Sequence, residues 1–295
     1  MSTLPVSIIG LGLMGEVYAT RLLAAGIPVR GFDIDPVRRA RLAEIGGVSL
    51  DSIAATLATP LRCILLAVFS TDQVEDVVEK QIPQAAGENS NAIVVCTTTA
   101  DPDRIDALAA RVTDRGLRLL DVPVSGTSEQ VRRGDGVALI GGDPAIAAEL
   151  ADIFDALFVR RFHIGRVGDG GRAKLAVNLI LGLNRLALAE GLVFAEKLGL
   201  DPEAFLQVAK GSASYSQVME TKGSKMLRGD FSPEGRVKQT LKDCHLMLDQ
   251  AASAGQTLPM LEVHASVLEA CVRSGEAELD NSAIINEVRR RGTKG

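Results

Sequence analysis

The chain has 295 residues, of which 46% are hydrophobic and 23% charged, and its formal net charge is −5. This length is sufficient for one large domain or two ordinary ones, and cores of that size need no disulfide or metal. The acidic balance, an aromatic content of 3% and the lack of tryptophan argue against nucleic-acid binding, for which basic stripes and stacking side chains are typical.

The thiols and imidazoles are too scattered along the chain to indicate a metal site, and we expect none. They are Cys63, Cys96, Cys244, Cys271, His163, His245 and His264. Without a CxxC pair, we expect reduced thiols in a cytoplasmic protein. We expect no signal peptide, because no basic region with a cleavage site precedes the first predicted strand. We also expect no membrane span, because the apolar stretch 175–198 includes Arg185, Glu190 and Lys197.

A glycine-rich motif follows the first predicted strand. The β-branched run 6–9 leads into Gly10-Leu11-Gly12-Leu13-Met14-Gly15, and a helix is predicted from there to about residue 25. This is G-x-G-x-x-G between a strand and a helix, as a dinucleotide-binding motif requires. Its glycines permit a tight turn, a close approach of the pyrophosphate and close packing of helix on strand, while the helix N-terminus favours phosphates. We therefore expect the whole motif to bind a dinucleotide cofactor.

An acidic residue ends the second predicted strand, at 26–32. Asp33 lies roughly 20 residues beyond the glycines, where a carboxylate that binds the adenosine ribose is expected. It would accept hydrogen bonds from the ribose hydroxyls and repel a 2′-phosphate, so we expect NAD(H) rather than NADP(H). Two alternatives stay open: Asp33 only caps the helix that starts near Pro36, or Arg38 and Arg39 bind a phosphate.

Strands and helices go on alternating through the first half of the chain. Further strands are predicted at 62–68, 91–96, 117–120 and 136–140. Helices are predicted at 71–80 (with Thr71 or Asp72 near its N-cap), from about 101, and at 144–154. The alternation predicts a doubly wound, mostly parallel α/β sheet of the Rossmann type. Ligands of such sheets bind beyond the carboxyl ends of the strands, where Val68, Phe69 and Thr99 fall.

From residue 168 onward the pattern is only helical. Helices are expected at 171–198, 202–211, 214–228, 234–254, 259–273 and 281–291, and proline marks three of their starts, in Asp201-Pro202, Ser232-Pro233 and Leu258-Pro259. We therefore expect a dinucleotide-binding domain at 1–166 and an all-helical domain at 167–295. Lys174 and Asn178 lie one turn apart on one face of the first long helix, which suits chemistry on a small anion.

Four stretches, in this order, carry a family resemblance. They are residues 9–15, Asp121-Val122-Pro123-Val124-Ser125-Gly126-Thr127, the G-x-G-x-x-x-K-x-x-x-N segment from Gly168 to Asn178, and Lys242-Asp243. Together they resemble the β-hydroxyacid dehydrogenase family, which includes 3-hydroxyisobutyrate dehydrogenase, tartronate semialdehyde reductase and the glyoxylate and succinic semialdehyde reductases. The resemblance implies a Rossmann domain followed by an all-helical domain, in a homodimer or homotetramer.

The resemblance also implies roles for individual residues. Lys174 would be the proton donor and acceptor, and Asn178 would orient the substrate beside it. Ser125 and Gly126 would hold the substrate carboxylate, with Thr127 at the wall of the substrate site. The residues implied to contact the cofactor are Val68, Phe69, Thr99 and Lys242.

The chain departs from the family pattern at four places. Thr127 replaces the second glycine of S-G-G, Val68-Phe69 replaces Leu-Pro, Cys96 replaces an aspartate, and Val177 replaces an asparagine. The last two are similar to the semialdehyde reductase branch.

The expected function is hydride transfer between NAD(H) and a short 3-hydroxy acid or its semialdehyde. One alternative is an NADPH-dependent reductase of the glyoxylate or succinic semialdehyde type. The other is a cofactor-binding protein without catalytic activity.

Overall fold

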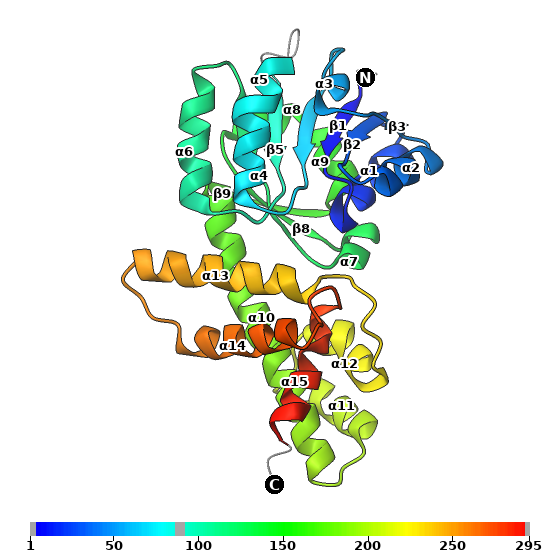
Figure 1. The fold of residues 1–295 in the computed structure, drawn as a ribbon, viewed down its shortest axis with the longest axis vertical. Coiled ribbons are helices and arrows are strands. Elements are labelled where there is room, and N and C mark those ends of the chain that lie inside the picture. Colours follow the sequence, from blue (N-terminus) through cyan, green and yellow to red (C-terminus); the bar gives the residue numbers. More distant parts are fainter. Residues whose placement is uncertain (1–3, 86–91, 293–295) are drawn as a thin grey trace. The chain divides into compact units, whose positions relative to one another are not determined.

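The computed structural model describes residues 4–85 and 92–292, and the chain forms two compact units (Figure 1). Unit 1 is Met1–Lys174 and unit 2 is Leu175–Gly295, so the division falls inside the long helix α10 (Asp169–Lys197). The predicted domain boundary between residues 166 and 167 remains a prediction.

Unit 1 is built on a sheet of nine described strands in the order β3-β2-β1-β4-β5-β6-β8-β7, with β9 paired to β8. The strands are β1 (Val6–Ile9), β2 (Val29–Phe32), β3 (Val48–Ser49), β4 (Cys63–Leu66), β5 (Ile93–Cys96), β6 (Arg118–Asp121), β7 (Val124–Ser125), β8 (Val137–Gly141) and β9 (Arg160–Gly165). Strands β1 to β6 pair in parallel, β8 runs antiparallel to β6 and β7, and β9 is parallel to β8. The predicted mostly parallel sheet is confirmed.

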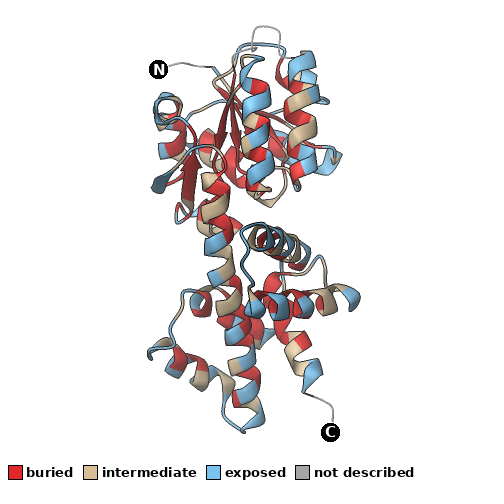
Figure 2. Ribbon diagram, turned by 90° about the vertical axis from the view of Figure 1, so that its left-hand side faces the viewer, coloured by how far each residue is buried: buried red, intermediate tan, exposed pale blue. Residues whose placement is uncertain are grey.

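Both faces of the sheet are buried at its central strands β1, β4 and β5, and the central strands appear in red in Figure 2. Successive strand residues point to opposite faces, so Cys63 and Leu65 of β4 join one hydrophobic cluster while Ile64 and Leu66 join the other. The helices of unit 1 are α1 (Leu13–Ala24), α2 (Pro36–Glu44), α3 (Ile53–Thr56), α4 (Thr71–Asp76), a π-helical turn (Val77–Gln81), α5 (Ile82–Ala85), α6 (Pro102–Thr113), α7 (Ser128–Arg132), α8 (Pro144–Glu149) and α9 (Ala151–Leu157). Because β-branched and leucine side chains fill both faces, the strands read as continuous apolar runs.

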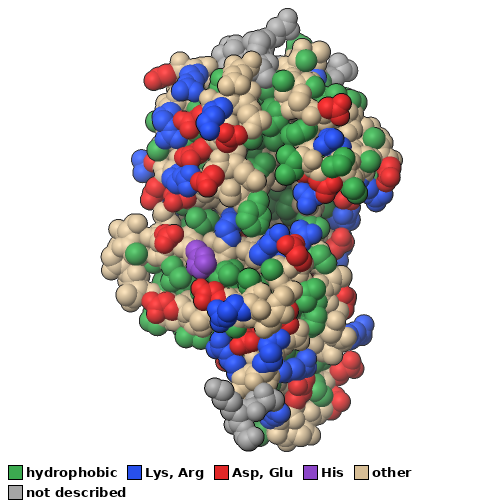
Figure 3. Space-filling view, viewed as in Figure 1, with side chains coloured by type: hydrophobic (Ala, Val, Ile, Leu, Met, Phe, Trp, Pro, Cys, Tyr) green, Lys and Arg blue, Asp and Glu red, His purple; other side chains and the backbone are tan. Residues whose placement is uncertain are grey.

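On the outer surface of α4 and α6, charged side chains of both signs are interspersed (Figure 3). Arg104 pairs with Asp72, and Arg111 pairs with Glu79 at 2.6 Å. Exposed pairs of this kind contribute about 0–1 kcal/mol each, so they belong to a solvated face rather than to a binding site.

Several details of unit 1 differ from the sequence-based expectation or sharpen it. Thr71 and Asp72 lie near the N-cap of α4, as predicted, and the cap itself is Ser70, whose hydroxyl forms a reciprocal capping box with the Gln73 side chain. The helix predicted at 144–154 is interrupted at Leu150, which separates α8 from α9. Strands β3, β7 and β9 were not predicted: β3 and β7 have only two residues each, and β9 is largely solvent-exposed.

Unit 2 is helical, as predicted. Its elements are the rest of α10, then α11 (Pro202–Lys210), α12 (Val218–Arg228), α13 (Val237–Ser253), α14 (Pro259–Arg273), a 3₁₀ turn (Asn281–Ala283) and α15 (Ile284–Arg291). Pro233 does not begin a helix, because α13 starts only at Val237. The segment before it bends at Glu234 and Gly235, and Arg236 then pairs with Asp280, just ahead of the 3₁₀ turn, through an isolated bridge.

Helix α10 is, among the described residues, the one helix long and apolar enough to cross a membrane by length and composition alone. Its Leu186, Ala189 and Leu192 belong to the hydrophobic core of unit 2, and Arg185 on the same helix is buried. A core helix meets the same criterion, so we assign α10 as the central core helix of this unit.

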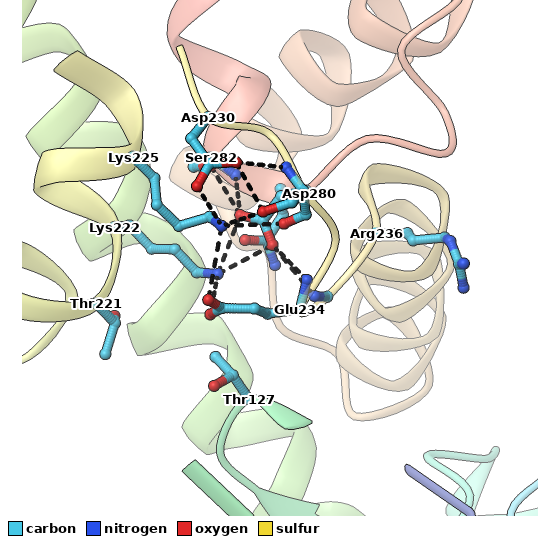
Figure 4. A network of polar contacts seen from close by, with 12 residues as sticks. Thr127, Thr221, Lys222, Lys225, Asp230, Glu234, Arg236, Asp280 and Ser282 are labelled. Atoms are coloured by element: carbon cyan, nitrogen blue, oxygen red, sulfur yellow. Dashed lines mark hydrogen bonds and ion pairs between the residues drawn. The ribbon is translucent and has the colours of Figure 1, made fainter. Parts of the chain in front are cut away.

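A buried ion-pair network ties the elements of unit 2 together (Figure 4). Asp280 is fully buried, and both of its carboxylate oxygens lie 3.0 Å from the Nζ of Lys222. The same carboxylate accepts hydrogen bonds from the N–H groups of Glu234 and Gly235 and from the hydroxyl of Ser282. The network therefore joins α12, the segment before α13 and the 3₁₀ turn.

Candidate active site

The glycine loop lies between β1 and α1 as predicted, and its geometry depends on missing side chains. Gly10 has a φ of +93°, and a Cβ atom there would lie 2.5 Å from the carbonyl oxygen of Ala67. A Cβ atom at Gly15 would lie 1.9 Å from the oxygen of Gly10, so helix and strand touch only because this residue has none. At Gly12 the nearest atom to an added Cβ would be Arg38 Nη1, at 3.7 Å, which is ordinary contact.

These contacts predict different effects for two alanine substitutions. Gly12→Ala should leave the melting temperature within ~1 °C and weaken NADH binding at least ~10-fold, because its methyl group occupies space that only the pyrophosphate needs. Gly15→Ala should weaken NADH binding too. In addition, it should lower the free energy of unfolding by about 1–3 kcal/mol, because α1 and β1 must move apart to make room for the methyl group. Thermal unfolding and NADH fluorescence titration measure both effects. NADH binding by Gly12→Ala as tight as by the wild type would contradict the predicted role of the loop.

Asp33 is 5% exposed and connects the end of β2 to the glycine loop. Its Oδ2 accepts the N–H of Leu11 at 2.7 Å and lies 3.2 Å from Arg38 Nη1, while Oδ1 accepts the N–H of Asp35 at 2.9 Å. The N-cap of α2 is Asp35, which accepts the N–H of Val37. The alternative that Asp33 serves only as this cap is therefore wrong.

The two arginines near Asp33 are already engaged. Arg38 pairs with both Asp33 and Asp35, and Arg39 donates to the backbone oxygen of Asp33 at 2.8 Å. The Arg39 guanidinium also lies over the ring of Phe32, 5.9 Å from its centre. A phosphate at this position would have to compete with these contacts.

The loops after β4 and β5 lie against each other at the same edge of the sheet. The hydroxyl of Thr98 donates to the oxygen of Val68 at 3.0 Å, and Phe69 donates its N–H to Gln73. Thr99 follows directly and is partly buried. Because β1, β2, β4 and β5 are parallel neighbours, the predicted cofactor residues of unit 1 gather at one edge.

The segment Ser125-Gly126-Thr127 runs from β7 into α7. Gly126 has a φ of +140°, which side chains rarely adopt, so a glycine is required there. Thr127 is the N-cap of α7: its hydroxyl accepts the N–H of Gln130, and the Gln130 side chain accepts the N–H of Thr127 at 2.8 Å. This capping box gives the threonine that departs from the family pattern a local structural role.

Asp121, at the end of β6, is a residue whose role the sequence did not reveal. It is 2% exposed, and its Oδ2 accepts the N–H of Gly171 in the first turn of α10 at 2.7 Å. Burial raises the pKa of this carboxyl to about 7, against the opposing effect of the N–H groups of Gly171 and Gly168. Lys174 follows one turn later in the helix and is 6% exposed.

In unit 2, the predicted Asn178 and Lys242-Asp243 belong to one hydrogen-bonded group. Asn178 donates its side-chain N–H to Asp243 Oδ2 at 3.0 Å, and Lys242 Nζ lies 3.0 Å from Asp243 Oδ1. Asp243 is buried, so this is more than an exposed helix pair. The sequence placed these residues in separate motifs, and their contact is new information from the structure.

The chain forms a mostly parallel sheet with G-x-G-x-x-G after its first strand and an acid after its second, and an all-helical unit follows in the sequence. This combination defines an NAD(P)-binding oxidoreductase. Residues 5–165 match a family model described as the NAD binding domain of 6-phosphogluconate dehydrogenase. Residues 168–288 match one described as NAD-binding of NADP-dependent 3-hydroxyisobutyrate dehydrogenase. The chain belongs to the NAD(P)-dependent β-hydroxyacid dehydrogenase family, as its four motifs indicated.

Relatives and solved structures agree with this assignment over nearly the full length. The chain is 30% identical to the 2-hydroxy-3-oxopropionate reductase of Escherichia coli over 94% of each protein. It is 31% identical to the L-threonate dehydrogenase of Cupriavidus necator, over 95% of this chain and 94% of the relative. The structure of a 3-hydroxyisobutyrate dehydrogenase from Salmonella typhimurium is 25% identical with a TM-score of 0.87, over 96% of this chain and 99% of that one.

Proposed function

We propose that this protein transfers hydride between NAD(H) and a short 3-hydroxy acid or its semialdehyde, with Lys174 as general acid and base. The observation that carries the proposal is the position of Lys174. This buried cation lies one turn after Gly171, whose N–H donates to Asp121 at the end of β6. The loops of the predicted cofactor residues follow β1, β2, β4 and β5, whose carboxyl ends lie at the same edge of the sheet.

The proposed mechanism follows the charge that develops on the substrate oxygen. Bound nicotinamide cofactor supplies or accepts the hydride. In reduction, the Lys174 ammonium stabilises the negative charge on the carbonyl oxygen and then donates its proton. In oxidation, the neutral amine removes the proton from the hydroxyl. Ser125 and Gly126 would hold the substrate carboxylate.

Asn178 has a defined orientation for its proposed role. Because its side-chain N–H donates to Asp243, its Oδ1 is the atom that can accept a hydrogen bond from a substrate hydroxyl. Lys242, paired with Asp243, would contact the cofactor. Thr99, Val68 and Phe69 would contact it from the strand ends.

The preference for NAD(H) rests on Asp33, and it can be tested by removing the charge alone. Asp33→Asn keeps an oxygen that can accept the N–H of Leu11 but no longer repels a 2′-phosphate. We expect the ratio of kcat/KM with NADPH to kcat/KM with NADH to rise at least ~10-fold. Arg38→Ala is the matched control and should not raise this ratio. Wild-type kcat/KM at least as high with NADPH as with NADH would contradict the proposal.

The test of the whole function is a substrate screen with both cofactors. The oxidation substrates are 3-hydroxyisobutyrate, 3-hydroxypropionate, 3-hydroxybutyrate, 4-hydroxybutyrate, glycerate, threonate and serine. Glyoxylate and succinic semialdehyde, assayed with NADPH, test the reductase alternative. NADH binding without turnover of any compound would favour a protein that binds the cofactor without catalysis.

We also propose a homodimer or homotetramer in the cytoplasm, acting on a small carboxylate, with domains at 1–166 and 167–295. Exposed apolar side chains on α10 and α14 of unit 2 support the oligomer; they are Ile180, Phe194, Met260 and Val263. All four cysteines are free and buried, which suits a reducing compartment. Light scattering of the purified protein measures the oligomeric state.

A further inference from the structure

The start of α10 is fixed to the sheet by close backbone contacts. A Cβ atom at Gly170 would lie 2.6 Å from the oxygen of Leu139 and 2.7 Å from that of Asp121. A Cβ atom at Gly141, at the end of β8, would lie 2.8 Å from the N atom of Gly170. The first turn of the helix therefore rests directly on the ends of β6 and β8, with no side chain between them.

The same turn is also tied to the start of α6. A Cβ atom at Gly168 would lie 2.7 Å from the oxygen of Pro102, and Arg172 pairs with both Asp103 and Asp169. The residues just before α6 include Thr99. The helix that carries Lys174 thus begins against two strand ends and against the segment that follows Thr99.

Within this contact Asp121 is the one carboxylate that bonds the helix backbone from the sheet, among the described residues. Its bond to the Gly171 N–H is 2.7 Å long and fully enclosed. A carboxylate at this point satisfies a helix N–H that has no partner within the helix and also compensates the positive end of the helix dipole. Lys174, one turn further on, adds a second positive charge near the same end.

We infer that Asp121 is a positioning residue for proton transfer, which holds the first turn of α10 and so fixes the place of the Lys174 ammonium relative to the strand ends. The inference rests on the proposed role of Lys174. A displacement of a reacting group by about 1 Å can lower a rate by ~10²-fold, so a single anchoring bond is sufficient to matter.

The ionisation of Asp121 can be followed separately, through the pH dependence of kcat. The charged groups near its carboxylate are Asp169 and Arg172 on α10, and Arg172 is paired to Asp103 of α6. On the neighbouring strand β5 its register partner is Cys96, whose thiol lies against the oxygen of Thr98. Because burial raises the pKa of Asp121 to about 7, its charge changes within the working pH range. We expect an ionisation near this pH in the profile of kcat.

The first test compares Asp121→Ala with Asp121→Asn. Asp121→Ala should lower kcat at least ~10-fold, while the Kd for NADH changes less than ~2-fold. Asp121→Asn keeps one acceptor oxygen for Gly171 but not the negative charge, so it should recover only part of kcat and lose the ionisation near pH 7. Asp143→Ala is the matched control: it removes the carboxylate that caps α8 and should leave kcat unchanged. If Asp121→Ala turned over at the wild-type rate, or Asp121→Asn kept the ionisation, the inference would be refuted.

The second test is a double-mutant cycle with Lys174→Ala. If Asp121 acts through Lys174, adding Asp121→Ala to Lys174→Ala should change the residual rate less than ~2-fold. A further loss as large as in the wild-type background would overturn the inference and leave the proposed function intact. Conversely, wild-type kcat in Lys174→Ala alone would refute the proposed function, whatever Asp121 does.

Discussion

Lys174→Ala is expected to lower kcat at least ~10²-fold in both directions, while NADH still binds with nearly wild-type affinity. General acid–base catalysis contributes typically ~10²–10⁴-fold, and charge stabilisation on the substrate oxygen is lost with the same side chain. The predicted cofactor contacts in the glycine loop and at Asp33 are not altered by this substitution. Steady-state turnover and NADH fluorescence titration separate the two effects.

Two further measurements distinguish the loss of proton transfer by Lys174 from the loss of its positive charge. Lys174→Arg keeps a cation that does not release its proton at working pH, so it should stay nearly as inactive as Lys174→Ala. A small primary amine added to Lys174→Ala should restore part of the activity. Turnover by Lys174→Ala within ~3-fold of the wild type would remove this residue from the mechanism.

The position of Lys174 has an energetic cost that makes a purely structural role a poor explanation. An ammonium near a helix N-terminus opposes the dipole, and burying it removes its hydration. Asp121 accepts the N–H of Gly171 in the first turn of the same helix and so offsets part of the dipole. A solvated surface lysine would need no such arrangement.

The sequence was sufficient to predict the sheet and to place the predicted cofactor residues at the carboxyl ends of its strands, because both depend on local signals. The run 6–15 encodes strand, turn and helix in one continuous segment, and the acid at Asp33 follows at the expected spacing. The helical nature of unit 2 was equally clear from periodicity. These features are local, so neighbouring residues are enough to specify them.

The contacts that the sequence did not reveal join residues far apart in the chain. Asp121 bonds to Gly171, and Asn178 bonds to Asp243, so each pair depends on how strands and helices pack. No periodicity marks such partners. The motif that contains Asp121 is visible in the sequence. Its spacing does not show that this residue accepts a hydrogen bond from the first turn of α10 rather than stabilising a local turn.

Smaller errors came from places where several adjacent residues suit the same role. Ser70 and Thr71 can both cap a helix, and the choice is made by backbone conformation and by Gln73. Pro233 suits a first helical turn, but Arg236 pairs with Asp280 through a β-bridge, and α13 begins only at Val237. Pairing with a segment distant in the chain thus overrides a local helix signal.

Asp280→Ala is expected to lower the free energy of unfolding by about 3–5 kcal/mol, the largest stability change that we predict. It would leave the buried ammonium of Lys222 without its main partner and two backbone N–H groups without an acceptor. Replacing both members, as Lys222→Met with Asp280→Leu, removes the unpaired charge and should recover part of the loss. Urea unfolding monitored by circular dichroism measures each variant.

The pH dependence of stability provides the control for this prediction. Burial by itself raises the pKa of Asp280, but Lys222, the N–H of Glu234 and the Ser282 contacts outweigh it, and the pKa lies below its ordinary value. A carboxyl with a lowered pKa stabilises the fold above the pKa of the unfolded chain, about 4, and this contribution is lost as the pH falls below that value. Asp280→Asn should flatten the stability profile in that range. Asp230→Asn, at an exposed aspartate between α12 and α13, should leave the profile nearly unchanged. Equal stability of Asp280→Ala and the wild type at pH 7 would show that the network does not hold unit 2 together.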